Sequence, residues 1–131
     1  MRGIIRGLFV TALGLGSVMA VTPSSNAATT PPGCDGSYFL CVYQLHDYEG
    51  DQLFTSQSNT NWDYLGNPAA FRNMNDKMSS VANTTSRTYA IVAQHDDLGG
   101  YQYCVTPGAR RPNVNNDIEN KSSSHKFVSS C

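Results

Sequence analysis

The side chains best suited to chemistry in this sequence are the oxygen donors of one short run, Asn75-Asp-Lys-Met-Ser-Ser80. Calcium binds six to eight oxygen atoms from carboxylates, amides, hydroxyls and backbone carbonyls. Within five residues the run supplies the amide of Asn75, the carboxylate of Asp76, a turning backbone and the hydroxyl of Ser79. This pattern predicts a calcium-binding loop. The competing interpretation is a tight turn in which Asx and Ser side chains bond to neighbouring backbone groups without an ion.

The run has a second copy in the other half of the chain. Met74–Ser80 lines up with Ile118–Ser124 at an offset of 44 residues, and Gly50–Leu53 lines up with Gly100–Tyr103 at an offset of 50. The drift of six residues falls in the intervening loop, which is longer in the first half. Glu119 keeps a carboxylate at the first position of the second copy but adds a methylene, so we expect this loop to bind calcium more weakly.

Short apolar stretches must position these loops, because Gly, Asn, Asp, Ser and Pro interrupt the rest of the chain. Tyr38–Tyr43 and Tyr89–Ala93 are rich in β-branched and aromatic residues and are predicted to be strands. Beyond residue 27, no segment keeps a helical apolar spacing over three turns. A repeat of about 50 residues suits a four-stranded antiparallel unit that stacks on its copy to bury a shared core. The sequence therefore predicts an all-β domain.

The start of the chain resembles a secretory leader. Arg2 and Arg6 precede an apolar run from Leu8 to Val21, and two small-x-small patterns end at Ala20 and Ala27. The alternative is a retained membrane anchor, but a run of about 14 residues is shorter than the ~20 that span a bilayer. We expect residues 1–27 to be a signal peptide, cut after either alanine, and the mature protein to be secreted to the extracellular space.

Composition narrows the possible partners of the mature chain. The whole sequence has 9 basic and 10 acidic side chains, and removal of the two leader arginines leaves 7 against 10. This mildly acidic balance does not favour nucleic acid, and no apolar run after the leader could span a membrane. Hydrophobic residues make up 40%, too many for a wholly disordered chain. We expect a disordered spacer over residues 28–33, then one monomeric domain over 34–131.

Export changes the interpretation of the cysteines, all four of which follow the leader. An even count in an exported chain indicates two disulfides. Three pairings are possible; Cys34 with Cys41 is the local choice and would leave Cys104 with Cys131. A zinc site is disfavoured because the chain has no C-x-x-C pair.

The hairpin and loop patterns together resemble a known superfamily. Tyr43, four residues, Tyr48, one residue and Gly50 match the hairpin signature of βγ-crystallin Greek keys. Asn75–Ser80 matches the calcium signature of that superfamily at every position (Asn/Asp, Asn/Asp, two variable residues, Ser/Thr, Ser). The resemblance covers about residues 34–131. It implies two Greek-key motifs packed as a disulfide-bonded βγ-crystallin-type sandwich.

The second half departs from that signature, since Ala93 and Leu98 replace its two hairpin aromatics. Within the superfamily, a leader followed by a Cys-x6-Cys pair looks most like secreted actinobacterial peptidase inhibitors directed at metalloproteinases. The implied partner is an extracellular peptidase, whose cleft the protein would occupy. The alternative function is a calcium-binding structural or antimicrobial module without a protease target.

The resemblance also implies which groups would hold calcium, through weak sites shared between loops and hairpin carbonyls. The first set comprises the Asn75, Asp76 and Ser79 side chains and the Lys77 and Gln44 carbonyls; the second comprises Asn120, Ser123 and the Lys121 and Gln94 carbonyls. Which residue serves which site stays open.

An inhibitor needs a rigid exposed loop that presents an apolar residue, because preorganisation reduces the entropy lost on binding. Tyr103–Gly108 has suitable residues: Cys104 would anchor the loop, Val105 would enter the enzyme's subsite, and Pro107 would stiffen the exit. Arg110 and Arg111 would suit a trypsin-like enzyme instead. The competing interpretation is an ordinary turn with Val105 in the core.

The remaining candidate side chains favour structural roles. His46, His95 and His125 show no metal-binding spacing and are predicted to lie on the surface. No nucleophile motif such as G-x-S-x-G occurs, so an enzyme is not expected. Trp62 and Tyr64 could stack on a sugar ring, but we expect Trp62 to belong to the core.

Overall fold

The computed structural model describes residues 30–131. The expected signal peptide and residues 28 and 29 of the spacer lie outside the described residues. Within them, no helix is long and apolar enough to cross a membrane.

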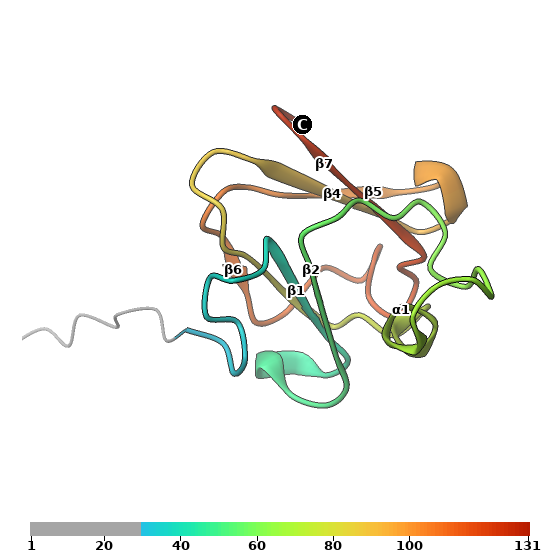
Figure 1. Cartoon of the computed structure of the whole chain (residues 1–131), viewed down its shortest axis with the longest axis horizontal. Helices are drawn as coiled ribbons and strands as arrows, with labels where there is room; N and C mark the ends of the chain where they lie inside the picture. The colour runs from blue at the N-terminus through green and yellow to red at the C-terminus, as the bar shows by residue number, and fades with distance from the viewer. Residues whose placement is uncertain (1–29) are drawn as a thin grey trace, which may run out of the picture.

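Two antiparallel sheets form the domain (Figure 1). The first has the order β2-β1-β3-β6, with β1 Leu40–Tyr43, β2 Gln52–Thr55, β3 Ser80–Asn83 and β6 Arg110–Arg111. The second has the order β5-β4-β7, with β4 Tyr89–Ala93, β5 Gln102–Val105 and β7 Ser124–Val128. A six-residue helix, α1 (Ala69–Met74), precedes β3, so the longest described helix is under two turns.

Each half of the chain contributes a segment to the sheet of the other half. Strand β6 from the second half pairs with β3, aligning Ala82 with Arg110. In return, Asn59 from the first half forms an isolated antiparallel bridge with His125 in β7. Because of this exchange the two Greek keys share one core, and neither half is closed by itself.

The backbone repeats at the offsets expected from the sequence. Two 3-10 turns, η1 (His46–Tyr48) and η2 (Asp96–Leu98), connect the strands of the two hairpins. Their last two residues adopt positive φ in both halves, 55° and 65° in the first and 53° and 61° in the second, at an offset of 50. Asp76 (φ 56°) and Asn120 (φ 55°) repeat at an offset of 44. The internal repeat is therefore confirmed in three dimensions.

The core lies between the two sheets and is apolar. Leu40 and Val42 from the first sheet meet Val92 and Val105 from the second, and Trp62 is fully buried among them. The prediction that Trp62 is a core residue is confirmed.

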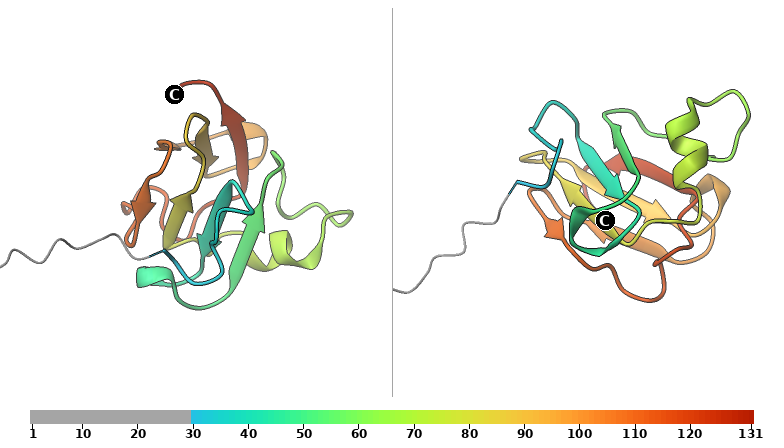
Figure 2. Two further views of the ribbon diagram at one scale, coloured as in Figure 1. Left: turned by 60° about the vertical axis from the view of Figure 1, so that its left-hand side comes forward. Right: turned by 90° about the horizontal axis from the view of Figure 1, so that it is seen from below.

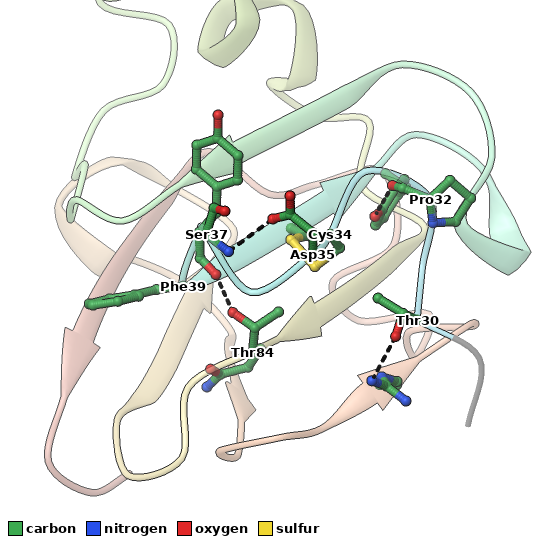
Figure 3. Close-up of a disulfide and its surroundings, with 12 residues drawn as sticks. Thr30, Pro32, Cys34, Asp35, Ser37, Phe39 and Thr84 are labelled. Atoms are coloured by element: carbon green, nitrogen blue, oxygen red, sulfur yellow. Dashed lines mark hydrogen bonds between the residues drawn. A yellow bond between two sulfur atoms is a disulfide. The ribbon is translucent and has the colours of Figure 1, made fainter. Parts of the chain in front are cut away.

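Both disulfides pair as the local choice predicted, Cys34 with Cys41 and Cys104 with Cys131. The first joins the segment before β1 to that strand, and Figure 3 shows it beside the Asp35–Ser37 turn. The second joins the carboxyl end of the chain to β5.

The expectation of a disordered spacer is wrong for its described residues. Pro31 is buried and its carbonyl accepts a hydrogen bond from Cys34 N at 3.0 Å, while the Pro32 carbonyl accepts one from the Tyr43 hydroxyl at 2.7 Å. Gly33 has φ +73°, and a Cβ there would lie 2.6 Å from the Phe54 ring. The packed domain therefore begins before Cys34.

Candidate functional site

The two Asx–Ser loops, residues 75–80 and 119–124, bond directly to one another. Asp76 N donates to Ser122 O at 2.8 Å, and Asn120 N donates to Met78 O at 2.9 Å. The left-handed conformations of Asp76 and Asn120 turn each loop toward the other half. This reciprocal pairing creates two surface pockets, each lined by one hairpin and both loops.

The first-hairpin pocket is lined by Gln44, Leu45, His46, Ser79, Glu119 and Asn120. Ser79 Oγ lies 3.5 Å from Asn120 Oδ1. The imidazole of His46 donates from Nε2 to Glu119 Oε1 at 2.5 Å, so the carboxylate of this pocket already has a strong partner.

The second-hairpin pocket is lined by Asp63, Asn75, His95, Asp96 and Ser123. Ser123 Oγ donates to Asp76 Oδ1 at 3.2 Å, and Asn75 Nδ2 donates to Asp76 Oδ2 at 3.1 Å. Asn75 Oδ1 is buried and accepts no hydrogen bond from the described part of the chain. The Asp76 carboxylate, the Asn75 amide and the Ser123 hydroxyl are therefore bonded together beside this pocket, although no three His, Cys, Asp or Glu side chains of the described residues are grouped as a metal site.

In the sequence, the expected calcium ligands are grouped loop by loop. In the structure, each pocket instead combines residues from both loops. Ser79 belongs with Asn120 and Gln44, whereas Asp76 and Asn75 belong with Ser123. This division follows from the reciprocal backbone hydrogen bonds, which bring each loop beside the hairpin of the other half. Lys77, Lys121 and Gln94 do not line either pocket. Gln94 instead donates from Nε2 to Asp117 O at 2.6 Å and accepts from Tyr101 N.

The expectation that Val105 enters an enzyme's subsite is wrong, and the competing interpretation, with Val105 in the core, is confirmed. Its side chain is fully buried in the core and its backbone pairs with Ala90 at the end of β5. The Val105 carbonyl also accepts a hydrogen bond from Asn83 Nδ2 at 2.9 Å. Cys104 is partly buried and disulfide-bonded. Arg110 and Arg111, expected in the same loop, form β6. Val105 therefore cannot enter an enzyme's subsite without unfolding β5.

The segment between β2 and α1 carries exposed apolar side chains, and it was not identified from the sequence as a protein-binding site. Between β2 and α1, Tyr64 is 63% exposed and Leu65 is 83% exposed. The sequence does not indicate that Leu65 is exposed, because an isolated leucine in a long insert resembles a core residue. Figure 2 shows this segment extending away from both sheets.

One of the three histidines contradicts the expectation of surface positions. His125 is fully buried, where its Nδ1 accepts from Trp62 Nε1 at 2.9 Å and its Nε2 donates to Gln57 O at 2.7 Å. Burial lowers the pKa of His125 to about 4, so the ring is neutral at pH 7. His46 and His95 are exposed, as expected.

Known proteins share both the sequence pattern and this fold. The model of peptidase inhibitor family I36 matches residues 27–105. The chain belongs to that family. Its members are inhibitors, which confirms the expectation that the protein is not an enzyme. Among proteins with curated descriptions, none matches the chain significantly.

Solved structures with this fold are βγ-crystallin domains. A double mutant of such a domain from Clostridium beijerinckii is 26% identical, with a TM-score of 0.56, covering 70% of this chain and 97% of that one. A domain from Flavobacterium johnsoniae is 22% identical, also with a TM-score of 0.56, covering 70% and 94%. The fold expected from the sequence is therefore confirmed: an I36 inhibitor built on a βγ-crystallin-type sandwich.

Proposed function

We propose that this protein is exported and inhibits an extracellular metallopeptidase by occupying its cleft. The observation that carries the proposal is the I36 match over residues 27–105, which makes the protein a peptidase inhibitor. The architecture supports occupation of a cleft, because two disulfides and a shared core stabilise the scaffold that carries the exposed loops. A preorganised loop loses little entropy on binding.

A panel of peptidases tests both the inhibition and the class of target. The oxidised protein, residues 28–131, is titrated against thermolysin as a zinc peptidase and against subtilisin and trypsin as serine peptidases. We expect inhibition of thermolysin that is competitive with a short peptide substrate and unchanged by added zinc, which excludes simple removal of the metal. Inhibition confined to the serine enzymes would contradict the metallopeptidase proposal while preserving the family assignment.

A second proposal concerns calcium, which we place in the second-hairpin pocket. The specific observation is the buried, unpartnered Asn75 Oδ1 beside the Asp76 carboxylate. With the Ser123 hydroxyl, these residues would supply hard oxygen donors of the kind that calcium prefers. Asp63 and Asp96 line the same pocket but are not grouped with Asp76 as a metal site. The first-hairpin pocket fits an ion less well, because none of the described residues that line it has a buried side-chain oxygen without a hydrogen-bond partner. The ion would serve as a structural tie between the halves.

Thermal melts with chelator and with ten millimolar calcium test the calcium proposal. At dissociation constants of about 10⁻⁴–10⁻³ M, binding would stabilise the fold by about 1.4–2.7 kcal/mol, a rise in Tm on the order of 5–15 °C. We expect Asp76→Asn to abolish the rise and the matched change Glu119→Gln, in the other pocket, to preserve it. A rise in Tm that is lost in Glu119→Gln and kept in Asp76→Asn would assign the ion to the first-hairpin pocket and contradict this proposal.

A further inference from the structure

The segment between β2 and α1 carries the most exposed apolar side chains among the described residues. Leu65 is 83% exposed and Tyr64 is 63% exposed, whereas the next large apolar side chain, Leu45, is 50% exposed. A leucine contributes to folding by leaving water, and Leu65 remains almost entirely in water. The fold therefore gains little from its presence, which distinguishes it from the partly covered aromatics elsewhere on the surface.

Hydrogen bonds hold the neck of this segment, which we call the tip loop (residues 63–67). The Asn67 side chain donates from Nδ2 to Asn61 O at 2.5 Å and accepts at Oδ1 from Asn59 Nδ2 at 3.0 Å. Asn67 N also donates to Tyr64 O at 2.9 Å. The Asn67 side chain therefore joins the two ends of the tip loop. These hydrogen bonds hold the loop without any contact from the Leu65 side chain.

The two ends of the tip loop are fixed to the scaffold. At the amino side, buried Trp62 donates from its backbone N to Ser123 O at 2.8 Å. From the carboxyl side, Arg72 in α1 donates from Nη1 to the carbonyl of Leu65, at the centre of the loop, at 3.0 Å. The Tyr64 ring lies across Gly66, where an added Cβ would be 2.4 Å from the ring. The backbone and Tyr64 are thus braced from within, whereas the side chain of Leu65 is exposed to solvent.

We propose that the tip loop is the segment that enters the peptidase cleft, with Leu65 filling an apolar subsite. This inference rests on the proposed inhibitory function. Its basis is the combination of an unused apolar side chain with a braced backbone, which binds at low entropic cost. The tip residues Asp63–Asn67 include no Lys or Arg, so the loop suits an enzyme with an apolar subsite rather than one whose subsite carries a carboxylate.

The decisive variant is Leu65→Ala, with Leu45→Ala as its matched control on the first hairpin. Against thermolysin, we expect Leu65→Ala to raise the inhibition constant on the order of 10- to 100-fold, the range for truncation of a buried apolar anchor. We expect the control to change it less than about twofold. The Tm of Leu65→Ala should equal that of the wild type, because the side chain is exposed.

The outcomes separate failure of the loop assignment from failure of the function. Wild-type inhibition that Leu65→Ala leaves unchanged would overturn the tip-loop proposal and leave the inhibitor proposal standing. A wild-type protein that inhibits no peptidase in the panel would overturn both. Self-association lost in Leu65→Ala, with inhibition unchanged, would assign the tip loop to contact between two copies of this chain. Asn67→Ala supplies an independent test, since it should weaken inhibition while retaining Leu65.

Discussion

Burial of His125 should make the stability of the fold depend on pH. Its pKa is lowered from 6.5 to about 4, first by desolvation, while the hydrogen bond to Gln57 O opposes part of the shift. Because the folded pKa lies below the unfolded value, the unfolded chain takes up the proton first as the pH falls. The stabilisation is complete above about pH 6.5 and is lost progressively as the pH falls toward about 4.

The size of the effect follows from the shift. A displacement of about 2.5 pKa units corresponds to about 3 kcal/mol in the acid limit. At pH 5 the loss relative to pH 8 is about 2 kcal/mol, because the unfolded imidazole is then almost fully protonated and the folded one is almost fully neutral. In urea, this loss moves the unfolding midpoint downward by about 1–2 M.

Trp62 provides the assay. It is the only tryptophan in the chain, it is fully buried, and its indole donates to His125, so its fluorescence reports unfolding of this region. Urea titrations at pH 8, 6 and 5 would be run on the wild type, on His125→Gln and on the exposed control His46→Gln. Subtracting the His125→Gln profile from the wild-type profile removes the contribution of the carboxylates to the pH dependence, because they titrate in both proteins.

We expect the wild-type advantage over His125→Gln to shrink by about 2 kcal/mol between pH 8 and pH 5. His46→Gln should retain the wild-type pH dependence. A difference between wild type and His125→Gln that is constant over this range would show that His125 titrates alike in the folded and unfolded chains. The reasoning from burial would then be refuted.

Two further predictions concern positions that the structure reassigns or confirms. Val105→Asp should lower the free energy of unfolding by about 3 kcal/mol or more, or abolish folding, because it buries a charge in the core; a soluble variant with wild-type Tm would contradict the burial of Val105. Replacing both Cys104 and Cys131 by serine should cost about 3.5 kcal/mol in urea titrations through the 27-residue loop that the bond closes, and a loss below about 1 kcal/mol would mean that the unfolded chain is already restricted there.

Features determined by local residue types could be predicted from the sequence. Tyr89–Ala93 forms β4 over the expected residues, and the offsets of 50 and 44 reappear as matched positive-φ positions. The short spacing between Cys34 and Cys41 favoured the correct pairing. In each case a local steric or chain-length constraint acts within a few residues, so the pattern can be recognised from the sequence alone.

Several features determined by distant contacts could not be predicted. Nothing near His125 indicates that Trp62, 63 residues away, donates to its ring. Pro107 and Gly108 suggested that Val105 lies in a loop, but pairing with Ala90 carries β5 through Val105 into the core. The side-chain contacts between the two Asx–Ser loops likewise depend on how the two halves pack together. Exposure of Leu65 is equally a tertiary property, because a leucine has no sequence signal for remaining in water.

The two proposed sites meet at one residue, and this has a thermodynamic consequence. Asp63 lines the second-hairpin pocket and directly precedes Tyr64 in the tip loop. An ion held there would tie the base of the tip loop to Asn75 and to the second hairpin, reducing the entropy that the loop loses in a peptidase cleft. If calcium strengthens inhibition by some factor, the bound peptidase must strengthen calcium binding by the same factor. Asp63→Asn should weaken that coupling while leaving Leu65 in place. If neither calcium nor Asp63→Asn changes the inhibition constant, the tip loop binds the peptidase independently of the ion site.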